Sequence, residues 1–222
     1  MKNRRDVLFG LGAAVLVGGV APLGLVYRGR SADPPYDFGR IGPSIDGLPV
    51  EDLRCTAGTL TPRQIEGPFY NPKTPLRGDI RDPFIEKDLL VIAGRVLDPQ
   101  CRPLAGAVLD FWQTDHAGRY DQHGYRYRGH QYTDAEGRFQ LVTVRPHPYT
   151  AMSLLRSPHI HVKVQGPATP LLATQLYLPD AEELNARDGG YDPLLEIRYA
   201  GQDGPARRAL FDFVLATAGP TA

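Results

Sequence analysis

Two histidines separated by one residue are the most chemically informative feature of the chain. His159 and His161 flank Ile160, and Val162 and Val164 continue an alternation of apolar and polar side chains that is typical of a β-strand. Residues two apart on a strand point to the same face, with Cα atoms roughly 6.5–7 Å apart. Two imidazoles in this arrangement can bind one metal ion. Two polar residues on a half-buried strand that bind no metal fit the same pattern. Only further candidate ligands elsewhere in the chain can distinguish a metal site from this alternative.

Tyrosines are the strongest source of further ligands. The chain has 11 of them, and five fall between residues 120 and 149: Tyr120, Tyr125, Tyr127, Tyr132 and Tyr149. A phenol, with a pKa near 10, becomes an anionic ligand at neutral pH only beside a strong Lewis acid such as Fe(III). Taken singly, each tyrosine is equally explained by ordinary packing with its hydroxyl at the surface.

The elements that must position these residues read as short strands. Turn signals such as Asp98-Pro99 and the Gly118 and Gly137 turns separate segments rich in β-branched or alternating residues, and we expect strands at 88–97, 104–113, 138–144, 159–166, 173–178 and 207–215. The pattern predicts an all-β fold, an antiparallel β-sandwich. Residues 114–137 and 145–158 are expected to be long active-site loops, and residues 180–187 one or two helical turns.

The N-terminal thirty residues form a separate segment. Arg4 and Arg5 precede an uncharged, mostly apolar run over residues 7–26, as in a twin-arginine export signal. The run is also long enough for a retained membrane anchor, and the sequence leaves cleavage and anchoring open. We expect an exported, periplasmic protein, anchored in the inner membrane if the run is kept. The predicted organisation is a signal or anchor helix at 1–30, an extended arm at 31–58 and one domain at 59–222.

Charge and cysteine content narrow the function classes. Without the five basic residues and one acidic residue of segment 1–30, the chain has 20 basic and 24 acidic residues. A mildly acidic domain without a basic stripe argues against nucleic-acid binding. An exported location allows the two cysteines, Cys55 and Cys101, to pair, and a disulfide between the arm and a sandwich loop is preferred to two free buried thiols.

The sequence from about Leu60 to Asp180 resembles the intradiol ring-cleavage dioxygenases, particularly the protocatechuate 3,4-dioxygenase type of subunit. The matching pieces are TPRQIEGPFY (61–70), the run LLVIAGRVLDPQCRPLAGAVLDFWQTDHAGRY (89–120), TDAEGRFQLVTVRPHPY (133–149), RSPHIHVKV (156–164) and TQLYLPD (174–180). The resemblance implies a β-sandwich with a mononuclear non-haem Fe(III), which converts a catechol-type diol and O₂ to a muconate-type diacid.

The resemblance also implies roles for individual residues. The metal ligands it implies are Tyr120, Tyr149, His159 and His161, with Tyr149 and His161 axial. Arg156 matches the family's active-site arginine, Gln175 a glutamine close to the reacting ring, and Trp112 an aromatic residue near the substrate pocket. Catalytic roles are therefore expected for Arg156, Tyr149 and Gln175.

Two departures limit the resemblance. The chain lacks the long helical N-terminal region of catechol 1,2-dioxygenases, and its export signal is foreign to typical cytosolic ring-cleaving enzymes. Protocatechuate, catechol, hydroxyquinol and larger phenolic diols all remain open as substrates, as does assembly with itself or with a homologous subunit. The alternatives from other classes are a non-catalytic, transthyretin-like binding module and a scaffold subunit, and the four intact ligand positions argue against both.

Overall fold

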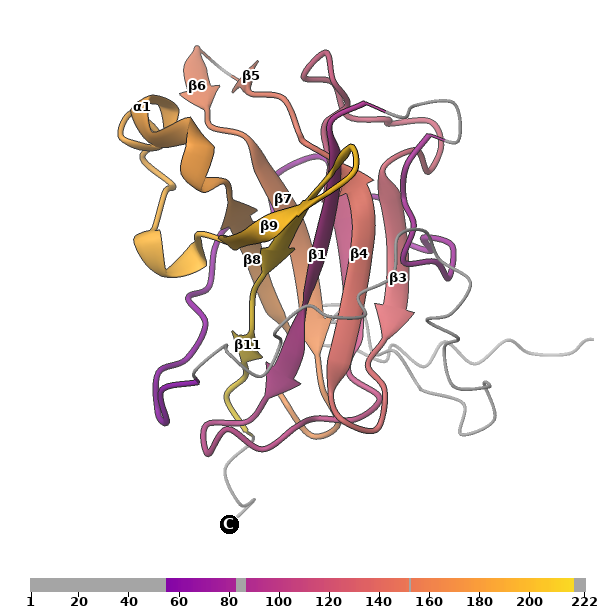
Figure 1. Cartoon of the computed structure of the whole chain (residues 1–222), viewed down its shortest axis with the longest axis vertical. Coiled ribbons are helices and arrows are strands. Elements are labelled where there is room, and N and C mark those ends of the chain that lie inside the picture. Colours follow the sequence, from indigo (N-terminus) through magenta and orange to yellow (C-terminus); the bar gives the residue numbers. More distant parts are fainter. Residues whose placement is uncertain (1–54, 83–86, 152, 218–222) are drawn as a thin grey trace, which may run out of the picture.

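A computed structural model describes residues 55–82, 87–151 and 153–217 of the chain as a sandwich of two β-sheets (Figure 1). The expected signal segment 1–30 and most of the expected arm 31–58 lie outside the described residues. Within the part of the chain that the structure describes, no helix is long and apolar enough to cross a membrane.

One layer is a four-stranded sheet in the order β3-β2-β7-β8, in which every pairing is antiparallel. Its strands are β2 (Val108–Gln113), β3 (Arg128–Tyr132), β7 (His159–Gln165) and β8 (Leu172–Tyr177).

The other layer has five strands, in the order β11-β1-β10-β9 with β4 also paired to β1. Its strands are β1 (Leu89–Leu97), β4 (Arg138–Val144), β9 (Arg198–Asp203), β10 (Ala206–Leu210) and β11 (Phe213–Val214). Strand β1 runs antiparallel to β4 but parallel to β10 and β11. The expected all-β fold with antiparallel sheets is therefore confirmed, and the parallel pairings of β1 with β10 and β11 are the exceptions that the sequence did not predict.

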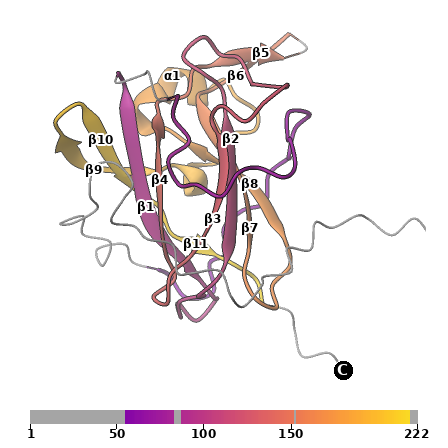
Figure 2. The same cartoon turned by 90° about the vertical axis from the view of Figure 1, so that its right-hand side faces the viewer.

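The core lies between the two sheets, which face each other in Figure 2. Strand alternation turns one set of side chains inward, and these are almost entirely aliphatic or aromatic. Its fully buried members include Ile92, Phe111, Phe139, Leu141, Ile160, Val162, Leu176 and Phe213. The central strand β7 thus gives its apolar residues to the core and leaves its histidines for the outer face.

A segment that we call the strap, residues 61–80, crosses the outer face of the four-stranded sheet. At one end, Gln64 donates its backbone N–H to Ala173 on β8 at 2.9 Å. At the other, Arg77 donates its backbone N–H to His130 on β3 at 2.8 Å, and the strap continues to β4, where the Ile80 N–H bonds Val142. The polar outer face of the sheet is therefore covered rather than left in water.

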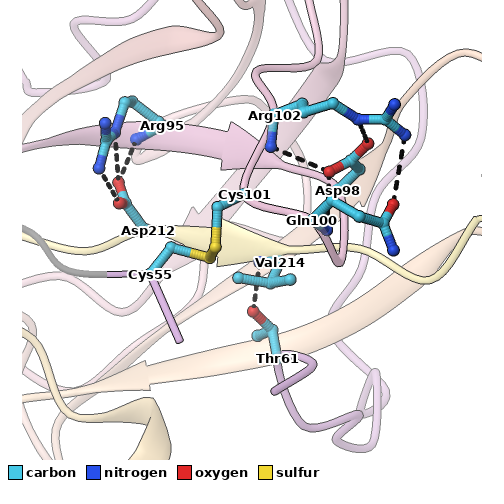
Figure 3. The surroundings of a disulfide bond; sticks show 9 residues. All are labelled: Cys55, Thr61, Arg95, Asp98, Gln100, Cys101, Arg102, Asp212 and Val214. Carbon is cyan, nitrogen blue, oxygen red and sulfur yellow. Dashed lines mark hydrogen bonds and ion pairs between the residues drawn. A yellow bond between two sulfur atoms is a disulfide. The ribbon is translucent and has the colours of Figure 1, made fainter. Parts of the chain in front are cut away.

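A disulfide between Cys55 and Cys101 lies just before the strap (Figure 3). It connects the described N-terminal end of the chain to the turn that follows β1, with Cα atoms 5.8 Å apart. The Thr61 hydroxyl accepts a hydrogen bond from the Val214 backbone at 2.8 Å close by. The start of the strap is thus fixed covalently and by β11.

Both expected long loops contain strands that the sequence pattern did not reveal. Residues 114–137 include β3, and residues 145–158 include a hairpin of β5 (Tyr149–Ala151) and β6 (Leu154–Arg156). The expected helical turns appear as the 3-10 helix η3 (Pro179–Ala181) followed by α1 (Glu182–Asn185), and a second 3-10 helix, η4 (Pro193–Leu195), precedes β9.

Candidate functional site

Strand register places the predicted site residues side by side on the outer face of the four-stranded sheet. His161 on β7 lies opposite Trp112 on β2 and opposite Gln175 on β8. His159 lies opposite Tyr177 on β8. Side chains directly opposite in antiparallel strands share a face, so three strands direct these groups to one place. The Trp112 ring stacks on the His161 ring at 4.8 Å, which fixes the plane of that imidazole.

The two imidazoles converge. Their Nε2 atoms are 3.1 Å apart, and both side chains are buried. The Nδ1 atom of His159 lies 2.7 Å from the carbonyl oxygen of Ser157, which can only accept, so Nδ1 carries the proton and Nε2 keeps its lone pair. Burial and the nearby Arg156 charge lower the pKa of His159 to about 4. Burial and His159 lower the pKa of His161 well below its ordinary value. Both rings are therefore neutral at pH 7, which is the form that binds metals.

Two tyrosines complete the group of donors. The Tyr120 hydroxyl is 3.5 Å from His159 Nε2, and the Tyr120 and Tyr149 rings lie edge to face at 5.3 Å. Tyr149, on β5, has its ring 5.7 Å from that of His159. Two phenols and two imidazoles thus surround one point, drawn from a loop, a hairpin and a sheet.

Gly118 allows the two tyrosine-bearing loops to approach each other. Its φ of +72° is in the left-handed region, and a Cβ at this position would lie 2.6 Å from the carbonyl oxygen of Pro148. The Thr114 hydroxyl donates to the His147 carbonyl at 2.8 Å and links the same loops. A glycine is therefore required at position 118, because a side chain there would push away the backbone that leads to Tyr149.

Tyr120 shows what kind of cation the site suits. Its pKa is raised well above the ordinary value, first by burial and then by the neighbouring Tyr149 phenol. Only a strong Lewis acid can ionise such a phenol at neutral pH. Among the described residues no group of three or more His, Cys, Asp or Glu side chains could hold a metal. A metal at this point must therefore take phenol oxygens, and the donor set fits Fe(III) rather than a ferrous site with a carboxylate.

Arg156 borders the donor group on a second side. Its Nη2 donates to the Gln175 side-chain oxygen at 2.7 Å and to the Tyr177 hydroxyl at 3.3 Å. Its Nε lies 3.0 Å from both carboxylate oxygens of Asp188. Burial lowers the pKa of Arg156, but Asp188 outweighs this effect and the pKa is raised. A permanent cation and an amide, both residues expected from the sequence, therefore stand beside the metal ligands.

The strap covers the site from the outer side of the sheet. Phe69 stacks on Tyr120 at 4.5 Å, and a Cβ on Gly67 would lie 3.6 Å from the His161 ring. Lys163 Nζ is paired with Glu66 at 2.9 Å and lies 3.4 Å from the centre of the Tyr70 ring. From the sequence, the Glu66-Gly-Pro-Phe-Tyr70 segment was open as part of the pocket rim or as simple packing of the arm. The structure places it against Tyr120 and His161, a contact with residues up to about ninety positions further along the chain that the sequence did not specify.

Comparison with known proteins agrees with this geometry. A dioxygenase family model matches residues 65–191, more than half of the chain. The beta chain of Burkholderia cepacia protocatechuate 3,4-dioxygenase is 33% identical over 170 residues, which cover 70% of this chain and 69% of that one. The chain belongs to the intradiol dioxygenase family. The matched range contains all four candidate ligands as well as Arg156 and Gln175.

Two further similar proteins indicate the extent of the match. Catechol 1,2-dioxygenase of Candida albicans is 35% identical over 146 residues, and the match covers 55% of this chain and 48% of that protein. The chain thus spans about half the length of that relative. The solved dioxygenase domain of a dioxygenase carbohydrate-binding protein fusion from Streptomyces sp. SirexAA-E is 42% identical, with a TM-score of 0.66, over 72% of this chain and 100% of that one.

Proposed function

We propose that the chain is a non-haem Fe(III) intradiol dioxygenase that uses O₂ to cleave a catechol-type diol, such as protocatechuate, to a muconate-type dicarboxylic acid. The observation that carries this proposal is the convergence of two neutral imidazoles and two phenols beside Arg156 and Gln175. A binding module or scaffold has no need to bury these groups together, because each buried polar side chain costs free energy unless it gains a partner.

Charge balance explains why phenols serve here. Tyr120 and Tyr149, as phenolates, would offset most of the charge of a ferric ion held with His159 and His161, and bound Fe(III) would supply the Lewis acidity that activates a diol. His159 is held in the tautomer that presents Nε2 by the Ser157 carbonyl. The stacked Trp112 ring fixes the plane of the His161 imidazole but not its tautomer.

The remaining residues manage protons and charge. Tyr149 lies on a short hairpin and is only half-buried, which makes it the better placed of the two phenols to accept a proton from the arriving diol. Arg156 stays protonated throughout, and its charge stabilises negative charge that develops on the ring carbon or the new oxygen atoms. Gln175 orients Arg156 through its side-chain oxygen and is itself held by the Ile65 carbonyl at 3.0 Å.

Colour and metal content test the iron proposal. The purified, iron-loaded protein should contain one iron per chain and show a visible tyrosinate-to-iron(III) charge-transfer band, which shifts when a diol is added without oxygen. Tyr149→Phe should shift the band and lower diol turnover. Tyr125→Phe is the matched control, because the hydroxyl of that exposed tyrosine donates to the Pro72 carbonyl of the strap at 3.2 Å and is not among the candidate ligands. A protein that stays colourless after ferric reconstitution contradicts the proposal.

The same proposal includes the cellular setting. The paired arginines Arg4 and Arg5 and the apolar run that follows support export to the periplasm in the folded state, with iron already bound. If residues 7–26 are retained, they anchor the protein in the inner membrane. The Cys55–Cys101 disulfide suits an oxidising compartment. Replacing both arginines with lysine should leave the protein in the cytoplasmic fraction, and unchanged export would contradict this part. Assembly with itself or a homologous chain is an expectation that sedimentation of the purified protein checks.

A further inference from the structure

Asp188 is the most completely bonded carboxylate beside the site. It lies outside the sequence motifs and has no role in the mechanism proposed above. It lies in the segment between α1 and η4, remote in sequence from the metal-ligand motifs. Its side chain is 1% exposed and faces Arg156, which is 13% exposed. One oxygen also accepts the Gly190 N–H at 2.9 Å, and the other accepts the Ser157 N–H at 2.9 Å.

These bonds join two parts of the site. Ser157 is the residue whose carbonyl accepts the His159 Nδ1 proton at 2.7 Å. Asp188 therefore holds the backbone N–H of the residue whose carbonyl orients one metal ligand, and with the same carboxylate it holds the head of Arg156. The Ser157 hydroxyl is bonded in turn to Asn185 of α1, so the whole 179–190 segment is attached at this point.

The chemistry of the partners requires a carboxylate. Every group that Asp188 contacts through its side chain is a donor: a guanidinium and two backbone N–H groups. An amide in its place would turn an NH₂ group toward at least one of these donors and would leave Arg156 without its counter-charge. The guanidinium, freed from Nε, would keep only its Nη2 bonds to Gln175 and Tyr177.

We propose that Asp188 is a positioning residue for the ring-cleavage reaction, which acts by holding the Arg156 guanidinium at a fixed place relative to the His159 strand. The inference rests on the proposed function. It assigns to Asp188 no contact with substrate or metal. A misplaced Arg156 still leaves the diol its ligands, so the loss should appear in kcat more than in diol affinity.

A double-mutant cycle tests this assignment with Asp188→Asn, Arg156→Met and both together. Asp188→Asn should keep its iron and its anaerobic diol affinity within about threefold, and lose about ten- to a hundredfold in kcat, which is the usual effect of a small misplacement. The double variant should be no slower than Arg156→Met alone, because the two residues act as one unit. Asp188→Glu should recover part of the loss. If the two losses instead multiply, Asp188 only supports the loop and the assignment is wrong.

Asp192→Asn is the matched control, because that aspartate lies in the same segment and its side chain accepts the Leu194 N–H at 2.9 Å, away from Arg156 and Ser157. It should leave kcat unchanged. The unfolding constants of the four proteins in the cycle give a second readout that needs no turnover, and we expect them to show coupling of at least tenfold. If the unfolding constants show strong coupling between Asp188 and Arg156 but the wild-type protein turns over no diol, the positioning of Arg156 by Asp188 is supported and the proposed function is overturned. Additive unfolding effects in an active protein would overturn the positioning alone.

Discussion

The outer faces of the two sheets are both covered, but they contain opposite kinds of side chain. On the five-stranded sheet the covered residues are mostly apolar, with the buried Gln140 as an exception. The apolar ones are Leu89, Val91, Val142, Val144 and Ala206, packed together with Tyr127. On the four-stranded sheet most of the covered side chains contain a polar group, and several of them are ionisable. They include Trp112, Arg128, His159, His161, Lys163 and Gln175, which are all buried. The first face gains free energy when it is covered, whereas the second costs free energy unless each group finds a partner.

This difference shows where function was placed. The strap meets most of the cost with specific bonds, such as Lys163 to Glu66 and the Tyr70 hydroxyl to Asp110 at 2.9 Å. Some donors stay without a protein partner among the described residues, including His161 Nδ1, Trp112 Nε1 and both terminal nitrogens of Arg128. In a native fold such buried groups call for a further partner, such as an ordered water or a bound ion, or for a catalytic role.

The largest contrast should come from one substitution on each face. His161→Ala should weaken iron binding by more than about a hundredfold, beyond the effect of removing an outer-shell partner, and abolish diol turnover. Val91→Ala, on the apolar face, should cost about 1–3 kcal/mol of unfolding free energy and leave turnover per iron unchanged. Metal analysis and chemical denaturation measure both. Equal loss of activity in the two variants would contradict the assignment of function to the polar face and of stability to the apolar face.

The disulfide should affect stability and not chemistry. It closes a loop with a sequence separation of 46 and fixes the start of the strap. Replacing Cys55 and Cys101 by serine should lower the unfolding free energy by about 2–4 kcal/mol. Turnover per bound iron should remain, because the strap keeps its bonds to β8 and β3. Loss of the charge-transfer band in the folded double variant would show that the strap depends on this bond for its place.

The polar face should make the metal-free protein sensitive to mild acid. The folded pKa of His159, about 4, lies below its ordinary value of 6.5, so the unfolded chain binds more protons between these values. The contribution of neutral His159 to the unfolding free energy is therefore fully present above pH 6.5 and is lost as the pH drops toward 4. His159 alone predicts a loss of about 2 kcal/mol between pH 7 and pH 5. Urea unfolding at both values checks this loss. His159→Asn should reduce it, whereas His123→Asn, in an exposed turn, should not.

The smallest expected effect concerns the strap's ion pair. Lys163 is 7% exposed and Glu66 42% exposed, so Glu66→Gln leaves an ammonium group that is nearly buried. We expect a loss of about 1–2 kcal/mol, less than the 3–5 kcal/mol for a fully buried pair because the partner is partly solvated. Glu136→Gln is the control, since that exposed glutamate pairs with Arg138 at the surface and should change stability by less than about 0.5 kcal/mol.

Local patterns predicted much of the sandwich and the direction of the histidines. The alternation around Ile160 placed both imidazoles on one face of β7, as the structure has them. The tyrosines were different: five were candidates, and only the resemblance to a family selected Tyr120 and Tyr149. Short strands such as β5 and β6, with three residues each, contain too little alternation to be recognised.

Contacts between distant segments could not be predicted from one sequence. The parallel pairing of β1 with β10, the strap over His161 and the Asp188–Arg156 pair each join residues whose spacing along the chain has no periodic signature. Glycines at 67 and 118 were visible, but their reason, close approach to His161 and to the Pro148 carbonyl, exists only in the folded chain.

The most direct test of the central claim is the product formed from catechol by the iron-loaded protein under ¹⁸O₂. We predict a ring-opened dicarboxylic acid, cut between the two hydroxyl-bearing carbons, with both atoms of O₂ incorporated. Mass spectrometry and NMR of the product identify the cut bond and the label together. Cleavage beside the hydroxyls, or unlabelled acid, would contradict intradiol chemistry at these four side chains.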